Sequence, residues 1–81
     1  MRLPRDRTGR ELSTLLRRHF GYEIVRQSGS HLRLPTLVNG EHRVTVPAGG
    51  PLWVDTRAAI LGDIATHHGI AHAELEERLF E

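Results

Sequence analysis

The sequence predicts a single α+β domain of 81 residues, in which a helix, three antiparallel strands and a second helix are followed by a short C-terminal helix. Three observations support this order: a capped amphipathic segment near the N-terminus, three strand-forming segments separated by Ser-Gly and Asn-Gly turns, and an apolar helical segment after Asp55. A three-stranded sheet presents one face to a core, and two amphipathic helices can cover that face. The opposite face is then left open.

The first helix is expected over residues 9–19. Thr8 and Glu11 have the spacing of a capping box, in which each side chain accepts a hydrogen bond from the other residue's backbone N–H. Gly21 is placed to end the helix, because glycine readily adopts the left-handed conformation of a C-terminal cap. The apolar stripe consists of leucines at helical spacing, Leu12, Leu15 and Leu16. The preceding residues, 1–7, are basic and polar and are expected to form a flexible arm.

Segments rich in strand formers predict strands at 22–27, 30–34 and 42–46. Ser28-Gly29 is expected to connect the first two strands, and Asn39-Gly40 marks the second hairpin, because such residues tolerate the positive φ angles of tight turns. Pro35 is expected to close the second strand.

Side chains alternate between the two faces of a strand. His31 and Arg33 should therefore share one face, and Leu32 and Leu34 the other. Ile24 and Val25 are both apolar, so the sequence leaves open which of them faces the core.

The second helix is expected to begin at Asp55 as its N-cap and to end at His67-His68-Gly69. Residues 47–51 should form the loop before it. An acidic segment, 71–81, is expected to add a short helix over 73–80, on which Leu75, Leu79 and Phe80 pack. The apolar face of the second helix is assigned to Ala58, Ala59, Ile60, Leu61, Ile64 and Ala65.

Composition excludes several classes of protein. No cysteine is present, so disulfide scaffolds and thiolate metal sites are excluded and a reducing, cytosolic environment is expected. No run of eighteen apolar residues and no signal-peptide pattern occurs, so neither a membrane partner nor export is expected.

Charge is unevenly distributed. Residues 1–43 carry nine Arg against four acidic residues, a net charge of +5, whereas residues 44–81 have a net charge of −4. All eleven basic residues are Arg, whose planar guanidinium suits bidentate contact with phosphate. A phosphate-bearing partner for the first half is one interpretation. Arg-rich coding in a GC-rich genome is the other.

Two segments carry a resemblance to a known family. Val25-Arg26-Gln27-Ser28-Gly29-Ser30-His31 and Arg43-Val44-Thr45-Val46-Pro47, with the helical segments around Leu12 and Ile60, resemble the HicA family of bacterial toxins (YcfA-like). The resemblance covers residues 8–70. It implies a double-stranded-RNA-binding-domain-like fold and a type II toxin–antitoxin module. It also implies an mRNA endoribonuclease that uses no metal or cofactor, a HicB-like antitoxin partner, and His31 as the catalytic residue.

The chemistry of these residues is compatible with that role. RNA carries its own nucleophile, the 2′-OH, and imidazole is suited to proton transfer near neutral pH. We therefore expect His31 to be the general acid or base. Phosphate contacts are assigned to Arg26, Arg33 and Arg43 and to the turn Ser28, Gly29 and Ser30. For the arginines the alternative is a solvated strand face, and for Ser30 it is ordinary turn chemistry.

Two other functions remain open. Ser28 stands where HicA proteins commonly have Lys, and one histidine alone lies at the expected site, so the domain could bind RNA without cutting it. The third hypothesis is an interaction protein that docks a partner through its acidic half.

Structural roles are expected for several histidines outside the candidate site. His42 is expected to be an exposed strand residue, and His67, His68 and His72 are expected to be structural, with no metal bound. Trp53 is expected to be either a lid over the edge of the core or an anchor for a partner.

Overall fold

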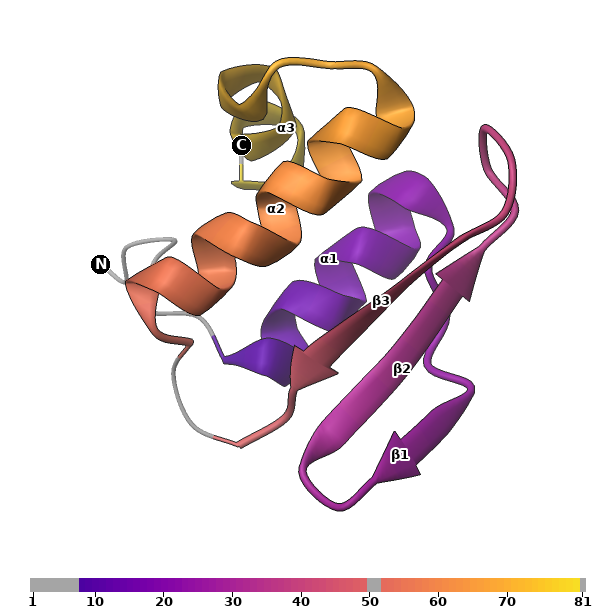
Figure 1. Cartoon of the computed structure of the whole chain (residues 1–81), viewed down its shortest axis with the longest axis vertical. Coiled ribbons are helices and arrows are strands. Elements are labelled where there is room, and N and C mark those ends of the chain that lie inside the picture. The colour runs from indigo at the N-terminus through magenta and orange to yellow at the C-terminus, as the bar shows by residue number, and fades with distance from the viewer. Residues whose placement is uncertain (1–7, 50–51, 81) are drawn as a thin grey trace.

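A computed structural model describes residues 8–49 and 52–80. The expected arm, 1–7, and the last residue of the acidic segment, Glu81, lie outside these ranges. The elements follow one another as α1 (Gly9–Phe20), β1 (Arg26–Ser28), β2 (His31–Thr36), β3 (His42–Pro47), α2 (Val54–His68) and α3 (His72–Phe80) (Figure 1). The predicted α-β-β-β-α order with an additional C-terminal helix is confirmed.

The three strands form one antiparallel sheet in the order β1-β2-β3. Helices α1 and α2 both pack against β3, and α3 packs on α1 and α2, away from the sheet (Figure 1). The alternating side chains Leu32, Leu34, Val44 and Val46 are buried under these helices. The helices therefore cover one face of the sheet, as predicted, and leave the other uncovered.

Helix α1 begins at the predicted capping box. The hydroxyl of Thr8 accepts from the backbone N–H of Glu11 at 3.1 Å, and the Glu11 carboxylate accepts from the backbone N–H of Thr8 at 2.9 Å. Gly21 ends the helix with a φ of 72°. At the other end, Gly9 touches the sheet so closely that a Cβ atom there would lie 1.6 Å from the carbonyl oxygen of Pro47. The start of α1 is thus fixed against the end of β3.

The first strand is shorter than the predicted 22–27. Tyr22 is fully buried in the core, and regular pairing begins only at Arg26. The intervening segment still runs beside β2, because the N–H groups of Glu23 and Val25 donate to the carbonyls of Pro35 and Arg33. Ile24 and Val25 are 47% and 65% exposed, so neither enters the core.

The first turn and the end of β2 also differ from the prediction. Ser28 belongs to β1, the turn consists of Gly29 and Ser30, and β2 begins at His31. Pro35 lies inside β2 rather than closing it. Its carbonyl accepts from Glu23, so its nitrogen faces the irregular segment before β1, where no ladder hydrogen bond is lost.

Helix α2 begins at Val54, and its N-cap position is Trp53, with no side-chain cap hydrogen bond. Asp55, the predicted N-cap, lies in the first turn, where a carboxylate still favours the helix N-terminus. Ala58 and Ala59 are exposed, contrary to the predicted apolar face, whereas the remaining four residues of that set are buried.

Helix α3 contributes Leu75 and Leu79 to the core, as predicted. It is joined to α2 by Arg57, which pairs with Glu76 and lies 5.0 Å from the centre of the Phe80 ring. Within the described ranges, no helix has the length and apolarity needed to cross a membrane.

Candidate functional site

The uncovered side of the sheet, called the open face below, carries the predicted site residues. His31 and Arg33 lie there on β2, alternating with buried leucines, and both are exposed. Arg26 on β1 is the cross-strand partner of Arg33, and Thr45 on β3 is the partner on the other side. Side chains of cross-strand partners point to the same face. The predicted sharing of one face by His31 and Arg33 is therefore confirmed.

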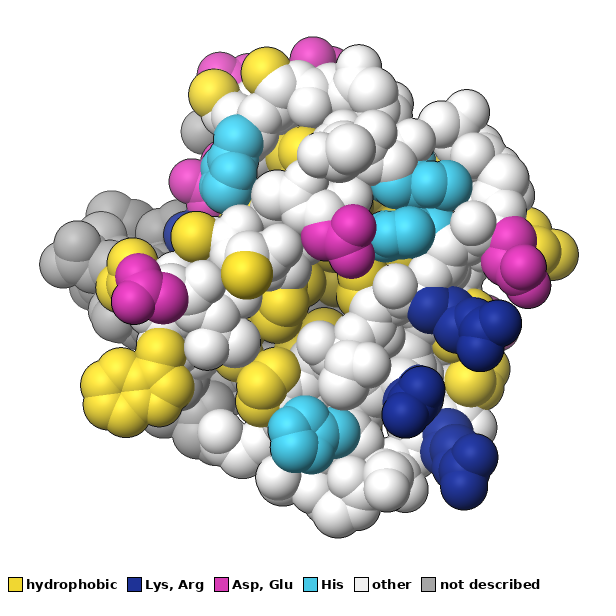
Figure 2. Space-filling view, viewed as in Figure 1, with side chains coloured by type: hydrophobic (Ala, Val, Ile, Leu, Met, Phe, Trp, Pro, Cys, Tyr) yellow, Lys and Arg dark blue, Asp and Glu magenta, His cyan; other side chains and the backbone are white. Residues whose placement is uncertain are grey.

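Three arginines gather on the open face. Arg26 on β1 and Arg33 on β2 are cross-strand partners. Arg43 on β3 is the cross-strand partner of Pro35 on β2. In the described parts of the chain none of the three forms an ion pair. Figure 2 shows arginines grouped over the strands with a histidine beside them. Directly opposed like charges destabilise a sheet, so an anion placed between Arg26 and Arg33 would relieve their repulsion.

The turn beside His31 is held on two sides. Gly29 has a φ of 60°, and its carbonyl accepts from the Gln27 amide at 3.0 Å. The carbonyl of Ser30 accepts from the backbone N–H of Ala48 at 2.6 Å. Ser28 is the cross-strand partner of His31 at the start of the turn. These contacts hold the turn next to the imidazole, and Gly29, Ser30 and the preceding Ser28 are all exposed.

His31 itself has no orienting partner among residues 8–49 and 52–80: no hydrogen bond or ion pair involves its ring. The other histidines lie on helices or on the covered side of the sheet, so the open face of the described chain has a single imidazole.

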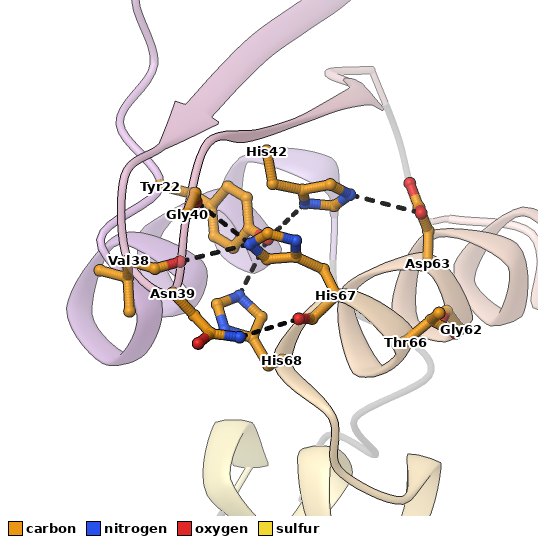
Figure 3. A network of polar contacts seen from close by, with 10 residues as sticks. All are labelled: Tyr22, Val38, Asn39, Gly40, His42, Gly62, Asp63, Thr66, His67 and His68. Atoms are coloured by element: carbon orange, nitrogen blue, oxygen red, sulfur yellow. Dashed lines mark hydrogen bonds and ion pairs between the residues drawn. The ribbon is translucent and has the colours of Figure 1, made fainter.

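A second polar constellation was not predicted. Tyr22, Asp63 and the imidazoles of His42, His67 and His68 form one network, called the histidine cluster below (Figure 3). The Tyr22 hydroxyl lies 2.7 Å from Nδ1 of His42 and 3.0 Å from Nε2 of His68. Nε2 of His42 lies 3.3 Å from Oδ1 of Asp63. The ring of His67 stacks on the ring of His42, with 4.3 Å between the ring centres.

The histidine cluster joins parts of the chain that are far apart in sequence. Nε2 of His67 lies 3.2 Å from the carbonyl oxygen of Gly40, and the Asn39 amide donates to the carbonyl of His67 at 3.0 Å. The β2–β3 turn, the start of β3 and the end of α2 are therefore tied around Tyr22.

The hydrogen bonds of the histidine cluster are all satisfied when both imidazoles that contact Tyr22 are neutral. His42 then donates from Nε2 to Asp63 and accepts from the Tyr22 hydroxyl at Nδ1, while the Tyr22 oxygen accepts from Nε2 of His68. Burial, with the neighbouring His67 and His42, lowers the pKa of His68. Burial, with the charge of Asp63, raises the pKa of Tyr22. Both effects favour the neutral forms.

This arrangement supports a structural role. The order Asp63, His42, Tyr22 has the form of a catalytic relay, but Tyr22 is 0% exposed, so its hydroxyl is out of reach of a substrate. No group of three or more metal-binding side chains is placed to hold an ion within the described ranges. The prediction that His42 is exposed is wrong, since its side chain is only 16% exposed.

Two remaining predictions concern single residues. Trp53 is 81% exposed, so the interpretation of this residue as a lid over the core is wrong. His72 lies apart from the histidine cluster, exposed at the start of α3.

Sequence spacing contains no sign of the histidine cluster, because its members come from three separate segments of the chain: Tyr22 after α1, His42 on β3, and Asp63, His67 and His68 on α2. Comparisons of the chain with protein-family models, with curated proteins and with solved structures found no match.

Proposed function

We propose that the chain is an endoribonuclease that cleaves mRNA without a metal, as the toxin of a HicA-like toxin–antitoxin module, with His31 as its catalytic residue. The observation that supports this best is the open face itself. An exposed imidazole lies there beside arginines that have no acidic partner in the described residues. Such a surface attracts a polyanion and offers it one group suited to proton transfer.

The proposed reaction is transesterification within the RNA. His31 removes the proton of a 2′-OH, the 2′-oxygen forms a bond to phosphorus, and the bond from phosphorus to the 5′-oxygen breaks. The leaving oxygen takes a proton, from the imidazolium or from water. The products are a 2′,3′-cyclic phosphate and a 5′-hydroxyl.

The arginines supply the electrostatic part of this mechanism. Arg33 is two residues from His31 on the same strand and face, and Arg26 is its direct cross-strand partner. Two guanidinium groups this close can hold one phosphate and stabilise charge that develops on its oxygens. Arg43 extends the contact to a neighbouring phosphate, and the backbone N–H groups of Ser28, Gly29 and Ser30 are candidates for further contacts.

The proposed partners are mRNA in the cytosol and a HicB-like antitoxin. An antitoxin that covered the open face would block both the imidazole and the arginines. Because Arg26, Arg33 and Arg43 are all exposed, acidic side chains on the antitoxin would complement this surface.

Cleavage of single-stranded RNA in excess EDTA tests the proposal. His31→Ala should lower the rate by roughly 10²–10⁴-fold, the usual contribution of a proton-transferring side chain. His19→Ala is the matched control, because His19 is an exposed histidine on α1. RNA with a 2′-deoxy substitution at the cleaved position should resist the native protein. Unchanged cleavage by His31→Ala would remove this residue from the mechanism.

A second function has a specific observation in its favour. His31 is the one imidazole on the open face of the described chain and lacks an orienting partner. A surface of this kind can also bind RNA through phosphate and 2′-OH contacts without cutting it. Retention of intact RNA by the native protein, reduced by Arg33→Ala and unaffected by His31→Ala, would favour this binding module.

A further inference from the structure

The side chain of Trp53 lies on the surface and contributes neither to the core nor to the cap of α2. Trp53 is 81% exposed. It occupies the N-cap position of α2, but its side chain makes no cap hydrogen bond. Its neighbour Leu52 is buried in the core and anchors the backbone at this point. The indole is therefore presented to solvent from a fixed position, although removing its area from water would be favourable.

The start of α2, which follows Trp53, lies toward the end of the sheet where β3 ends and β2 begins (Figure 1). Pro47 is the cross-strand partner of His31, and the N–H of Ala48 donates to Ser30 in the turn before it. Trp53 follows Ala48 by five residues, so their Cα atoms are at most about 18 Å apart. A nucleic-acid strand of a few nucleotides can span such a distance.

The three arginines of the open face lie on one side of His31. Along β2, Arg33 follows His31, and Arg43 lies beyond it across the sheet. In the opposite direction, neither the described residues of the β3–α2 connection, 48–49 and 52–53, nor the first residues of α2, 54–55, include a cation. Arg57, the next one along α2, is paired with Glu76. Arg10 at the start of α1 donates to Gln27 on the β1 side of the turn, so a strand that leaves His31 toward the β3–α2 connection instead would need a contact other than charge.

We propose that Trp53 is a base-stacking platform for RNA, placed on the side of His31 opposite the arginines. This inference rests on the proposed binding of RNA to the open face. An indole stacks on any base, so the contact would position the strand across His31 without reading sequence. Arginines would hold phosphates on one side of the cleaved bond, and Trp53 would hold a base on the other.

Trp53 is not the only large apolar side chain in the described residues that is this exposed, so an equally exposed residue elsewhere can serve as a control. Leu37 is also 81% exposed, but it follows β2 at the end of the strand opposite to His31. Leu37→Ala should therefore remove an equally exposed apolar side chain without affecting the path of the RNA. Trp53→Phe keeps an aromatic ring of smaller area and should retain part of the contact.

The test uses the fluorescence of the single tryptophan. Titration with a single-stranded RNA whose 2′-hydroxyls are methylated, so that it cannot be cleaved, should quench this fluorescence. Binding followed by anisotropy of a labelled RNA should weaken roughly 5- to 150-fold in Trp53→Ala, the value expected for one lost base stack. Trp53→Phe should lose less, and Leu37→Ala should bind like the native chain. Unfolding midpoints of all three variants should stay close to the native value.

Two outcomes would overturn the inference in different ways. If RNA binds and Arg33→Ala weakens it, but Trp53 is not quenched and Trp53→Ala binds normally, RNA binding stands and the stacking role fails. If the native chain does not bind RNA, the stacking role and the proposed function fail together, and a protein partner becomes the explanation for the exposed indole.

Discussion

Tyr22→Phe is the substitution most informative about the histidine cluster. It removes one oxygen atom from a fully buried ring and leaves the packing of that ring unchanged. The removed hydroxyl joins His42 at 2.7 Å and His68 at 3.0 Å, so two hydrogen bonds are lost together.

The expected cost follows from the groups that remain. Nδ1 of His42 is left without its partner in a side chain that is 16% exposed, whereas Nε2 keeps its contact with Asp63. His68 loses its contact with the phenol but remains against the ring of Phe20. One poorly solvated acceptor and one lost hydrogen bond together predict a loss of about 2 kcal/mol in the free energy of unfolding. In a domain of this size that corresponds to a fall in Tm of about 8–16 °C.

Urea unfolding at pH 8, followed by far-UV circular dichroism, measures this loss. Thr66→Val is the matched control, because it removes an exposed hydroxyl on α2 that bonds only within its own helix. The control should change the free energy of unfolding by less than about 0.5 kcal/mol. A double-mutant cycle between Tyr22→Phe and His68→Gln should show coupling, since the two side chains are in contact. A loss in Tyr22→Phe no larger than in the control would refute the assignment of the cluster as a stabilising network.

Two further predictions concern glycine and pH. Gly9→Ala should destabilise the fold by about 1–3 kcal/mol or more, because its Cβ would overlap the carbonyl of Pro47. Gly62→Ala, at an α2 position with nothing within 4 Å of the added Cβ, should stabilise the fold by about 0.5–1 kcal/mol; equal effects of the two in thermal unfolding would contradict this reasoning. The lowered pKa of His68 means that the unfolded chain binds this proton more readily than the folded one. Its contribution to stability is therefore complete above pH about 6.5 and is lost as the pH falls from there through the folded-state pKa. Between pH 8 and pH 5.5, the free energy of unfolding should therefore vary less with pH in His68→Gln than in the native chain. His72→Gln should leave this pH dependence unchanged.

Short-range patterns were enough to predict much of the fold. The capping box of Thr8 and Glu11 acts over three residues, and glycine at position 21 supplies the left-handed cap within the same segment. The alternation of His31 and Arg33 with leucines needs only the period of a strand and one covered face. The open face could therefore be recognised from residues close together in sequence, although its function is still a proposal.

Tertiary packing decided the features that these patterns could not reveal. Tyr22 has the propensity of a strand residue, but burial against distant histidines draws it into the core and shortens β1. Asp55 is a better N-cap than Trp53 by type, yet the N-cap lies two residues earlier, at Trp53, next to the buried Leu52. The histidine cluster joins side chains up to 46 positions apart. Such contacts have no sequence period, because they depend on how the helices and the sheet pack together rather than on the conformation of any one segment.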